Sequence, residues 1–219
     1  MAALWAMIRA AFGLGSKQSA TVVVVGLDGS GKTTILNQLK PGSVPSYEVA
    51  PTVGLSVEEF ETDSIKFQAF DMSGESRSRA LWDRQYASAD AIIFVLDSGD
   101  RMRLAVAKDE LDHMLEQPAV AERPVPLLVF ANKMDLRGAM EPVECMAGLG
   151  LQGITTKPWH IQASDARSGT GLEEGMRWLT AHCERFLRAK AAGFPKPGGA
   201  GGASGGAAAA AAGASSGKS

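Results

Sequence analysis

The stretch VVVVGLDGSGKTT, residues 22–34, decides the fold because it joins two kinds of element through a glycine-rich turn. Its apolar run predicts a buried strand over residues 20–26, and the residues after the last glycine predict a helix over 32–40. Between them lies the pattern G-x-x-x-x-G-K-[ST], carried by Gly26, Gly31, Lys32 and Thr33. A strand before it and a helix after it form the context in which this pattern binds phosphate.

This loop is expected to hold a nucleoside triphosphate with Mg²⁺. Its glycines let backbone N–H groups surround an anion, and the helix N-terminus adds a partial positive charge. We expect the Lys32 side chain to reach the β and γ phosphates, as a catalytic and a binding group, and the Thr33 hydroxyl to ligate the metal. The expected nucleotide contacts within the loop are Gly26, Leu27, Asp28, Gly29, Ser30, Gly31, Lys32, Thr33 and Thr34.

Strands and helices alternate through the rest of the middle of the chain. Further strands are predicted at residues 55–62, 65–71, 91–97, 125–131 and 158–161. Helices are predicted from apolar residues at three- and four-residue spacing at 101–116, 141–149 and 171–187. This order predicts a three-layer α/β domain, with helices on both faces of a mostly parallel six-stranded sheet. Its ligand site is expected at the carboxyl ends of the strands.

Composition and charge exclude several other classes of protein. The 219-residue chain has a net charge of −2 and 45% hydrophobic residues, which predicts one globular domain and no nucleic-acid partner. Its two cysteines lack a CxxC spacing and its three histidines are scattered, so neither a zinc site nor a disulfide framework is expected. Cysteine usage favours the reducing cytoplasm. No apolar run reaches the roughly eighteen residues that a membrane-spanning helix needs.

The two ends differ from the predicted domain at residues 17–192. An apolar stripe at helical spacing predicts an amphipathic helix over residues 1–16, formed by Leu4, Trp5, Ile8 and Phe12. This helix either covers an edge of the core or lies in a membrane interface, and one helix can do both in different states. A secretory signal is disfavoured because no basic leader precedes the apolar part. Residues 193–219 are rich in Gly, Ala and Ser and are expected to be a disordered tail.

The base of the nucleotide is predicted from the sequence ANKMD after the strand at 125–131. A carboxylate only accepts hydrogen bonds, so Asp135 suits the N1–H and the exocyclic amine of guanine and does not suit adenine. The stem of Lys133 can cover the base plane, while Asn132 is expected to tie this loop to the phosphate loop. Together with the phosphate loop, this pattern favours GTP over ATP.

Two short motifs between these loops are predicted to sense the γ-phosphate. Thr52, in APTVG, can give Mg²⁺ a second protein ligand next to Thr33. Asp71 and Gly74 form D-x-x-G after a strand, where Asp71 can hold a water on the metal and the Gly74 N–H can meet a γ-phosphate oxygen. Both motifs lie in loops that can order or relax with the nucleotide.

These motifs, in order and spacing, resemble those of the ADP-ribosylation-factor-like small GTPases. The segments that carry the resemblance are GLDGSGKTT, PTVG, FDMSGE, LWDRQY, ANKMDL and ASDA. The resemblance implies a monomeric GTPase that binds GTP and GDP with Mg²⁺ and works with an exchange factor and a GTPase-activating protein. It also implies that backbone groups of Asp165 and Ala166 contact the guanine, and that residues 55–71 shift register with GTP and release the N-terminal helix.

FDMSG, RLAVAKDEL and KPWHIQASDA most resemble a ciliary branch of that family, which is linked to Bardet-Biedl syndrome. For that branch the resemblance implies a cytoplasmic protein that attaches to membranes at the cilium or its base in the GTP form. It further implies recruitment of a BBSome-type coat to those membranes.

Three positions depart from the family pattern. Glu75 stands where a water-positioning Gln is usual; an ionised carboxylate only accepts and brings negative charge toward the phosphates, so hydrolysis is expected to be slow. Ala2 stands where many relatives carry the glycine needed for a myristoyl anchor. Leu55 replaces a frequent Phe on the effector surface. The sequence therefore leaves two hypotheses open: a hydrolysing switch with Glu75 as a catalytic residue, or a non-hydrolysing GTP-dependent adaptor.

Overall fold

The computed structural model describes residues 17–40, 55–72 and 82–194. The strands of these segments are β1 (Gln18–Val25), β2 (Leu55–Glu61), β3 (Ile65–Met72), β4 (Ala91–Asp97), β5 (Leu127–Asn132) and β6 (Trp159–Ala163). The helices are α2 (Lys32–Leu39), α3 (Trp82–Ser88), α4 (Leu104–Glu116), α5 (Pro118–Ala121), α6 (Pro142–Leu149) and α7 (Leu172–Ala192). Two 3₁₀ turns, η2 (Arg101–Arg103) and η3 (Leu151–Gly153), complete the order.

The strands form one six-stranded sheet in the order β2-β3-β1-β4-β5-β6. β2 runs antiparallel to β3, and every other neighbouring pair is parallel. The predicted mostly parallel sheet is confirmed. Because parallel strands share one direction, the loops that follow β1, β3, β4, β5 and β6 all leave the same edge of the sheet.

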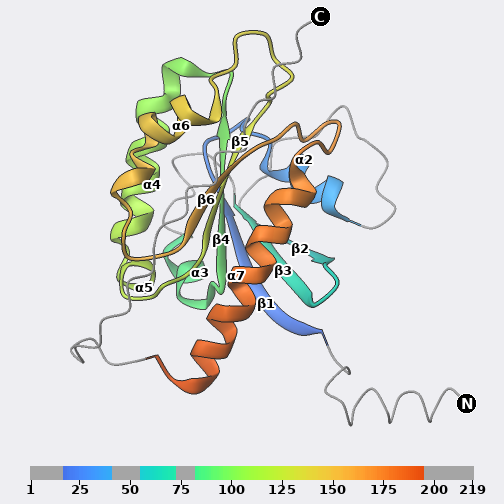
Figure 1. Cartoon of the computed structure of the whole chain (residues 1–219), viewed down its shortest axis with the longest axis vertical. Helices are drawn as coiled ribbons and strands as arrows, with labels where there is room; N and C mark the ends of the chain where they lie inside the picture. Colours follow the sequence, from blue (N-terminus) through green and yellow to red (C-terminus); the bar gives the residue numbers. More distant parts are fainter. Residues whose placement is uncertain (1–16, 41–54, 73–81, 195–219) are drawn as a thin grey trace, which may run out of the picture.

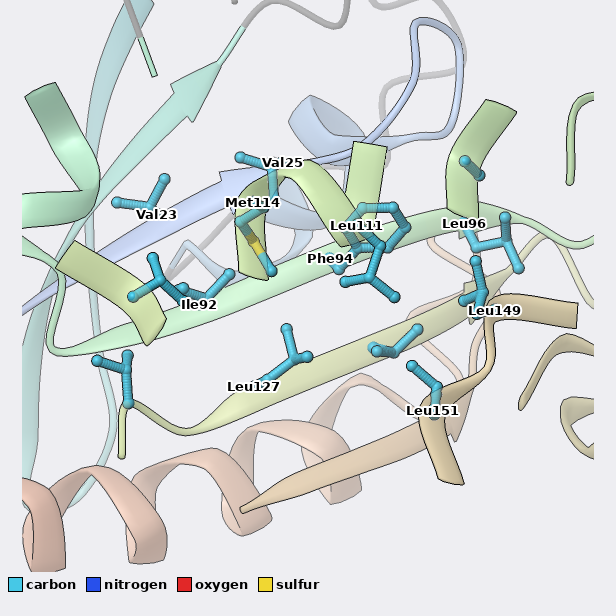
Figure 2. Close-up of a cluster of buried hydrophobic side chains, with 14 of the residues drawn as sticks. Val23, Val25, Ile92, Phe94, Leu96, Leu111, Met114, Leu127, Leu149 and Leu151 are labelled. Atoms are coloured by element: carbon cyan, nitrogen blue, oxygen red, sulfur yellow. The ribbon is translucent and has the colours of Figure 1, made fainter. Parts of the chain in front are cut away.

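Both faces of the sheet are covered, which explains the continuous apolar runs of its central strands. Val22 and Val24 of β1 pack in a cluster with residues of α2 and α7, whereas Val23 and Val25 pack in a cluster with residues of α4 and α6. Figure 2 shows the second cluster, in which Leu111 of α4 lies over side chains of the central strands. The three predicted layers are visible in Figure 1, with α7 on one side of the sheet and α4 and α6 on the other.

The helix ends follow local chemistry. The predicted helix at 101–116 begins as the 3₁₀ turn η2, which the Asp100 carboxylate caps by accepting the Arg103 N–H at 3.1 Å. α6 begins with a capping box between Glu141 and Glu144, and it ends at Gly150, whose φ of 68° suits glycine.

Several element boundaries differ from the sequence predictions: β1 covers Gln18–Val25 where 20–26 was predicted, and β5 covers Leu127–Asn132 where 125–131 was predicted. α7 runs to Ala192, although apolar spacing stopped at Leu187. β6 covers Trp159–Ala163 and is shifted from the predicted 158–161, because this half-buried edge strand lacks a strong apolar run. The short elements α3, α5 and η3 were not predicted, since they are too short to show a helical period.

Some predictions fall on residues that the structure does not describe. The N-terminal helix at 1–16, Thr52, Gly74 and Glu75 lie outside the described residues, as does the predicted tail from residue 195 onward. Phe194, which the sequence prediction placed in the tail, packs its ring against Phe186 with centroids 5.3 Å apart. None of the helices within the described segments is long and apolar enough to cross a membrane.

Candidate functional site

The loop between β1 and α2 has the backbone that its glycines predict. Gly26, Gly29 and Gly31 adopt φ angles of 140°, 70° and 100°, which side chains disfavour. A Cβ at Gly26 would collide with the Val95 carbonyl oxygen, and one at Gly31 would collide with the amide nitrogen of Asn132. The loop therefore curls closely against the ends of β4 and β5, as a phosphate-binding loop requires.

Lys32 lies folded over this loop. Its ammonium donates to the carbonyl oxygens of Gly26 and Leu27, each at 2.9 Å, and the residue is only 6% exposed. Burial lowers the pKa of Lys32 to about 8, although the nearby charges of Asp71 and Asp28 favour the protonated form. A phosphate bound at this loop would give the desolvated ammonium a stronger anionic partner.

Thr33 and Asp71 meet at the start of α2. The parallel register of β1 and β3 pairs Val24 with Asp71, which brings the end of β3 beside the phosphate loop. The Thr33 hydroxyl donates to a carboxylate oxygen of Asp71 at 2.5 Å, and Asp71 is fully buried. Hydroxyl and carboxylate oxygens are the hard donors that Mg²⁺ prefers, so these two residues fit the predicted metal.

Ser30 gives a further indication that this loop is built around a ligand. The residue is 1% exposed, and its hydroxyl oxygen has no hydrogen-bond partner among the described residues. Buried polar atoms are normally satisfied. An unsatisfied hydroxyl beside a glycine-rich turn and a desolvated lysine therefore fits a polar, anionic ligand at this loop.

Asn132, the last residue of β5, ties three loops together. Its amide nitrogen donates to the Ser30 carbonyl at 2.8 Å, and its amide oxygen accepts from the Ala166 N–H at 3.0 Å and the Ser164 hydroxyl at 3.3 Å. The residue is 1% exposed. The structure thus contains the predicted link between the base loop and the phosphate loop, and it adds the loop after β6.

The other residues of the predicted base site lie on either side of Asn132. Lys133 has a φ of 66°, unusual for a residue with a side chain, and its ammonium pairs with the Asp97 carboxylate at 2.7 Å. Asp135 is exposed in the turn that follows. A base lying over this turn would meet a lysine stem fixed by Asp97 and an accessible carboxylate.

The loop after β6 is stiffened by its own residues. Burial tends to raise the pKa of Asp165, but hydrogen bonds from Ser168 and the Arg167 N–H outweigh it and lower this pKa. The Asp165 carboxylate accepts the Arg167 N–H at 2.9 Å, so the side chain is engaged within the loop. Backbone groups of Asp165 and Ala166 accordingly remain the predicted contacts with a base.

Sequence reasoning missed two residues, Asp97 at the end of β4 and Arg103 in the turn that follows it. Asp97 fixes Lys133, and Arg103 pairs with Asp28 of the phosphate loop at 3.1 Å and with Asp100 at 2.6 Å. Its position at the carboxyl end of a strand would have indicated Asp97, because that end of the sheet is where ligands bind. Arg103 begins the segment RLAVAKDEL, which carries the resemblance, but the sequence does not indicate a contact with the phosphate loop.

The structure brings the phosphate loop, Asp71, the base loop and the loop after β6 to one edge of the sheet (Figure 1). The arrangement can hold a ligand with an anionic, metal-bound end at Lys32 and Thr33 and a planar polar end at Asp135. The predicted residues outside the described segments, Thr52, Gly74 and Glu75, are not placed relative to it.

Known proteins share this sequence and fold. The sequence model of the ADP-ribosylation factor family matches residues 6–183. The chain is 53% identical to ADP-ribosylation factor-like protein 6 of Danio rerio over 163 residues, covering 74% of this chain and 88% of the relative. It is 42% identical to the protein of the same name from Caenorhabditis elegans over 179 residues, covering 82% and 94%.

A solved structure with the same fold is described as the Arl6 BBS3 small GTPase of Trypanosoma brucei with the bound nucleotide analogue GppNp. The two structures superpose with a TM-score of 0.71 at 42% sequence identity, covering 77% of this chain and 99% of that one.

Proposed function

The chain belongs to the ADP-ribosylation factor family of small GTPases, which bind GTP and GDP with Mg²⁺ and hydrolyse GTP, and on that premise we propose how its own residues do so. The switch has a phosphate end at residues 26–34 and a guanine-reading end at Asn132, Lys133 and Asp135. Asp165 and Ala166 complete the base end through their backbone.

One observation carries this proposal: Asn132 joins the two ends. The same buried amide holds the carbonyl of Ser30 in the phosphate loop and the N–H of Ala166 in the loop beside the base. A ligand that spans both loops gains from their being fixed relative to each other, because less motion is lost on binding. A nucleotide has the required shape, with phosphates at one end and a base at the other.

Within this assignment the chain's own residues divide the work. Lys32 binds the β and γ phosphates, and Thr33 with Thr52 ligates Mg²⁺, which when bound neutralises charge on the phosphates. Gly74 senses the γ-phosphate, and Asp71 orients the Thr33 hydroxyl. Glu75 makes hydrolysis slow, because a carboxylate replaces the usual water-positioning Gln.

A non-hydrolysing adaptor is the second candidate, and Glu75 is the feature that favours it. Single-turnover hydrolysis of bound GTP, with and without candidate activating proteins, separates the two. Conversion of bound GTP to GDP in either condition supports the slow GTPase, whereas no conversion in both conditions supports the adaptor.

Base selectivity tests the guanine site. Asp135→Asn removes the charge and replaces one of the two acceptor oxygens that face the N1–H and the amine with a donor, so GTP affinity should fall by about 1.5–3 kcal/mol while xanthine nucleotide affinity rises. Asp63→Asn, at an exposed turn between β2 and β3, is the matched control and should change neither. GTP affinity that is equal in both variants would contradict the assignment of Asp135.

The finer function is a membrane switch for ciliary transport. The GTP form would expose the helix at 1–16, attach to membrane and recruit a BBSome-type coat, with an exchange factor and an activating protein controlling the cycle of a monomer. Support comes from the apolar stripe of that helix and from similarity to ADP-ribosylation factor-like protein 6. We place this activity in the cytoplasm and on membranes at the cilium or its base.

Pelleting with liposomes tests the membrane step. Burial of the apolar side chains of this stripe would supply affinity for the membrane, at about 1.5–3 kcal/mol for each one fully buried. Trp5→Ala with Phe12→Ala should abolish pelleting of the protein loaded with a non-hydrolysable GTP analogue and leave nucleotide affinity unchanged. Equal pelleting of the GDP and GTP forms would return the helix to a role as a cover of the core.

A further inference from the structure

We propose that Arg103 is a positioning residue that holds the phosphate loop from outside through Asp28. The inference rests on the proposed function, because it concerns the loop that surrounds the nucleotide phosphates. Arg103 lies at the end of η2, directly before α4, and it is the first residue of RLAVAKDEL, a segment to which the resemblance assigned no role.

The contacts of Arg103 form a fork between two carboxylates. One terminal nitrogen of the guanidinium donates to the Asp28 carboxylate at 3.1 Å and to the Asp28 carbonyl at 3.3 Å. The Nε atom donates to the Asp100 carboxylate at 2.6 Å. Asp100 also accepts the backbone N–H of Arg103 at 3.1 Å, so the arginine is fixed at both ends of its side chain. The fork therefore anchors the loop to a capped turn of the fold.

The outer turn of the phosphate loop is closed by its own hydrogen bond, from the Ser30 N–H to the Leu27 carbonyl at 3.3 Å. Gly29 has a φ of 70°, and a Cβ added there would meet nothing within 4 Å, so this turn is not packed against the fold. Asn132 holds the loop further along, at the Ser30 carbonyl. Glycine also gives the backbone the greatest freedom to move. Arg103 thus acts on the segment of the loop that the interior contact does not reach.

Fixing the Asp28 carbonyl also orients a donor. In a trans peptide the carbonyl oxygen and the N–H of the next residue point in opposite directions. With the Asp28 oxygen turned toward Arg103, the Gly29 N–H is directed away from Arg103. Backbone N–H groups of such loops are the ones that bind phosphate. Loss of Arg103 should therefore let this peptide rotate and weaken the hold on a bound nucleotide.

The competing explanation is a surface ion pair of no functional consequence. The side chains of Arg103 and Asp28 are 38% and 67% exposed, and exposed pairs contribute little to stability. Arg101 provides the matched comparison, because it lies on the same 3₁₀ turn. Its guanidinium pairs with Glu144 of α6 at 3.0 Å, with side chains 61% and 44% exposed. Both arginines hold a surface carboxylate, but only Arg103 contacts the phosphate loop.

The test is the rate at which a fluorescent GDP leaves the full-length chain in excess unlabelled GDP and Mg²⁺. We expect Arg103→Ala to accelerate release about fivefold, the factor that corresponds to one exposed charge-assisted contact. Arg101→Ala should change the rate less than about twofold. Arg103→Lys should release GDP as fast as Arg103→Ala, because one ammonium cannot bridge two carboxylates and a carbonyl as the guanidinium does.

A purely structural role would lower the thermal midpoint of both alanine variants alike and leave their release rates equal. Equal release from Arg103→Ala and Arg101→Ala would overturn the proposal, and so would full rescue by lysine. A wild-type chain that retains no guanine nucleotide would instead overturn the proposed function, and this inference with it. The wild-type measurement therefore tells the two failures apart.

Discussion

Replacing Asn132 with alanine should disconnect the two ends of the nucleotide site. The substitution removes the hydrogen bond that Asn132 donates to Ser30 and the two that it accepts from Ser164 and Ala166, and all three partners are at most 4% exposed. Each buried group left without a partner costs about 1–3 kcal/mol. At the lower end, the native state loses about 3 kcal/mol, which lowers the thermal midpoint of a domain of this size by about 6–12 °C.

The same substitution should also weaken nucleotide binding. If the whole 3 kcal/mol is lost only in the nucleotide-bound state, GDP release accelerates about 100-fold. Destabilisation that the nucleotide-free protein shares does not weaken binding, so it reduces that factor. Fluorescent GDP release and thermal unfolding of the same preparation measure the two effects. Asn37→Ala is the control. Within the described residues the Asn37 side-chain oxygen accepts a hydrogen bond from the Lys40 ammonium at 3.2 Å, which joins no two loops of the site. Release within threefold of wild type for Asn132→Ala would refute the argument that this residue joins the loops.

Three further changes test other parts of the site and the core. Thr33→Asn should weaken GTP more than GDP in titrations at low and high Mg²⁺, because it removes the metal-ligating hydroxyl; equal losses would contradict that role. Glu75→Gln should accelerate single-turnover GTP hydrolysis, and an unchanged rate would mean that the carboxylate does not limit it. Burial raises the pKa of Cys145 to about 11 and that of Cys183 to about 12, so both thiols stay neutral at pH 8. They should resist a thiolate-specific reagent until the protein is unfolded, and rapid labelling of the native chain would contradict their burial.

The sequence predicted the fold where hydrophobic pattern decides it and failed where long-range contacts decide it. The buried runs of β1 and β4 are covered on both faces, so periodicity found them. α7 continues to Ala192, beyond Leu187, the last residue of the apolar pattern, because Lys190 pairs with the buried Asp90 at 2.6 Å. That ion pair spans 100 residues of sequence, and no local pattern reports it.

The candidate site shows the same division. Lys32, Thr33 and Asn132 belong to motifs whose spacing alone indicates phosphate and base chemistry. Arg103 and Asp97 do not, because their roles depend on β4 lying beside β1 and β5 in the sheet. Once that neighbourhood is known, the turn after β4 must lie next to both nucleotide loops. The missing information was therefore the strand order, which local sequence does not contain.

The contacts of Asn132 and Arg103 with the phosphate loop differ in strength because they differ in burial. Asn132 acts inside the protein, where an unmade hydrogen bond carries its full desolvation cost. Arg103 acts at the surface, where water replaces a lost ion pair at little cost. Stability should therefore depend on Asn132 and scarcely on Arg103, while nucleotide release depends on both. A loop fixed firmly at Ser30 and lightly at Asp28 opens first at its outer turn, so release of the phosphates should begin there without unfolding the base site.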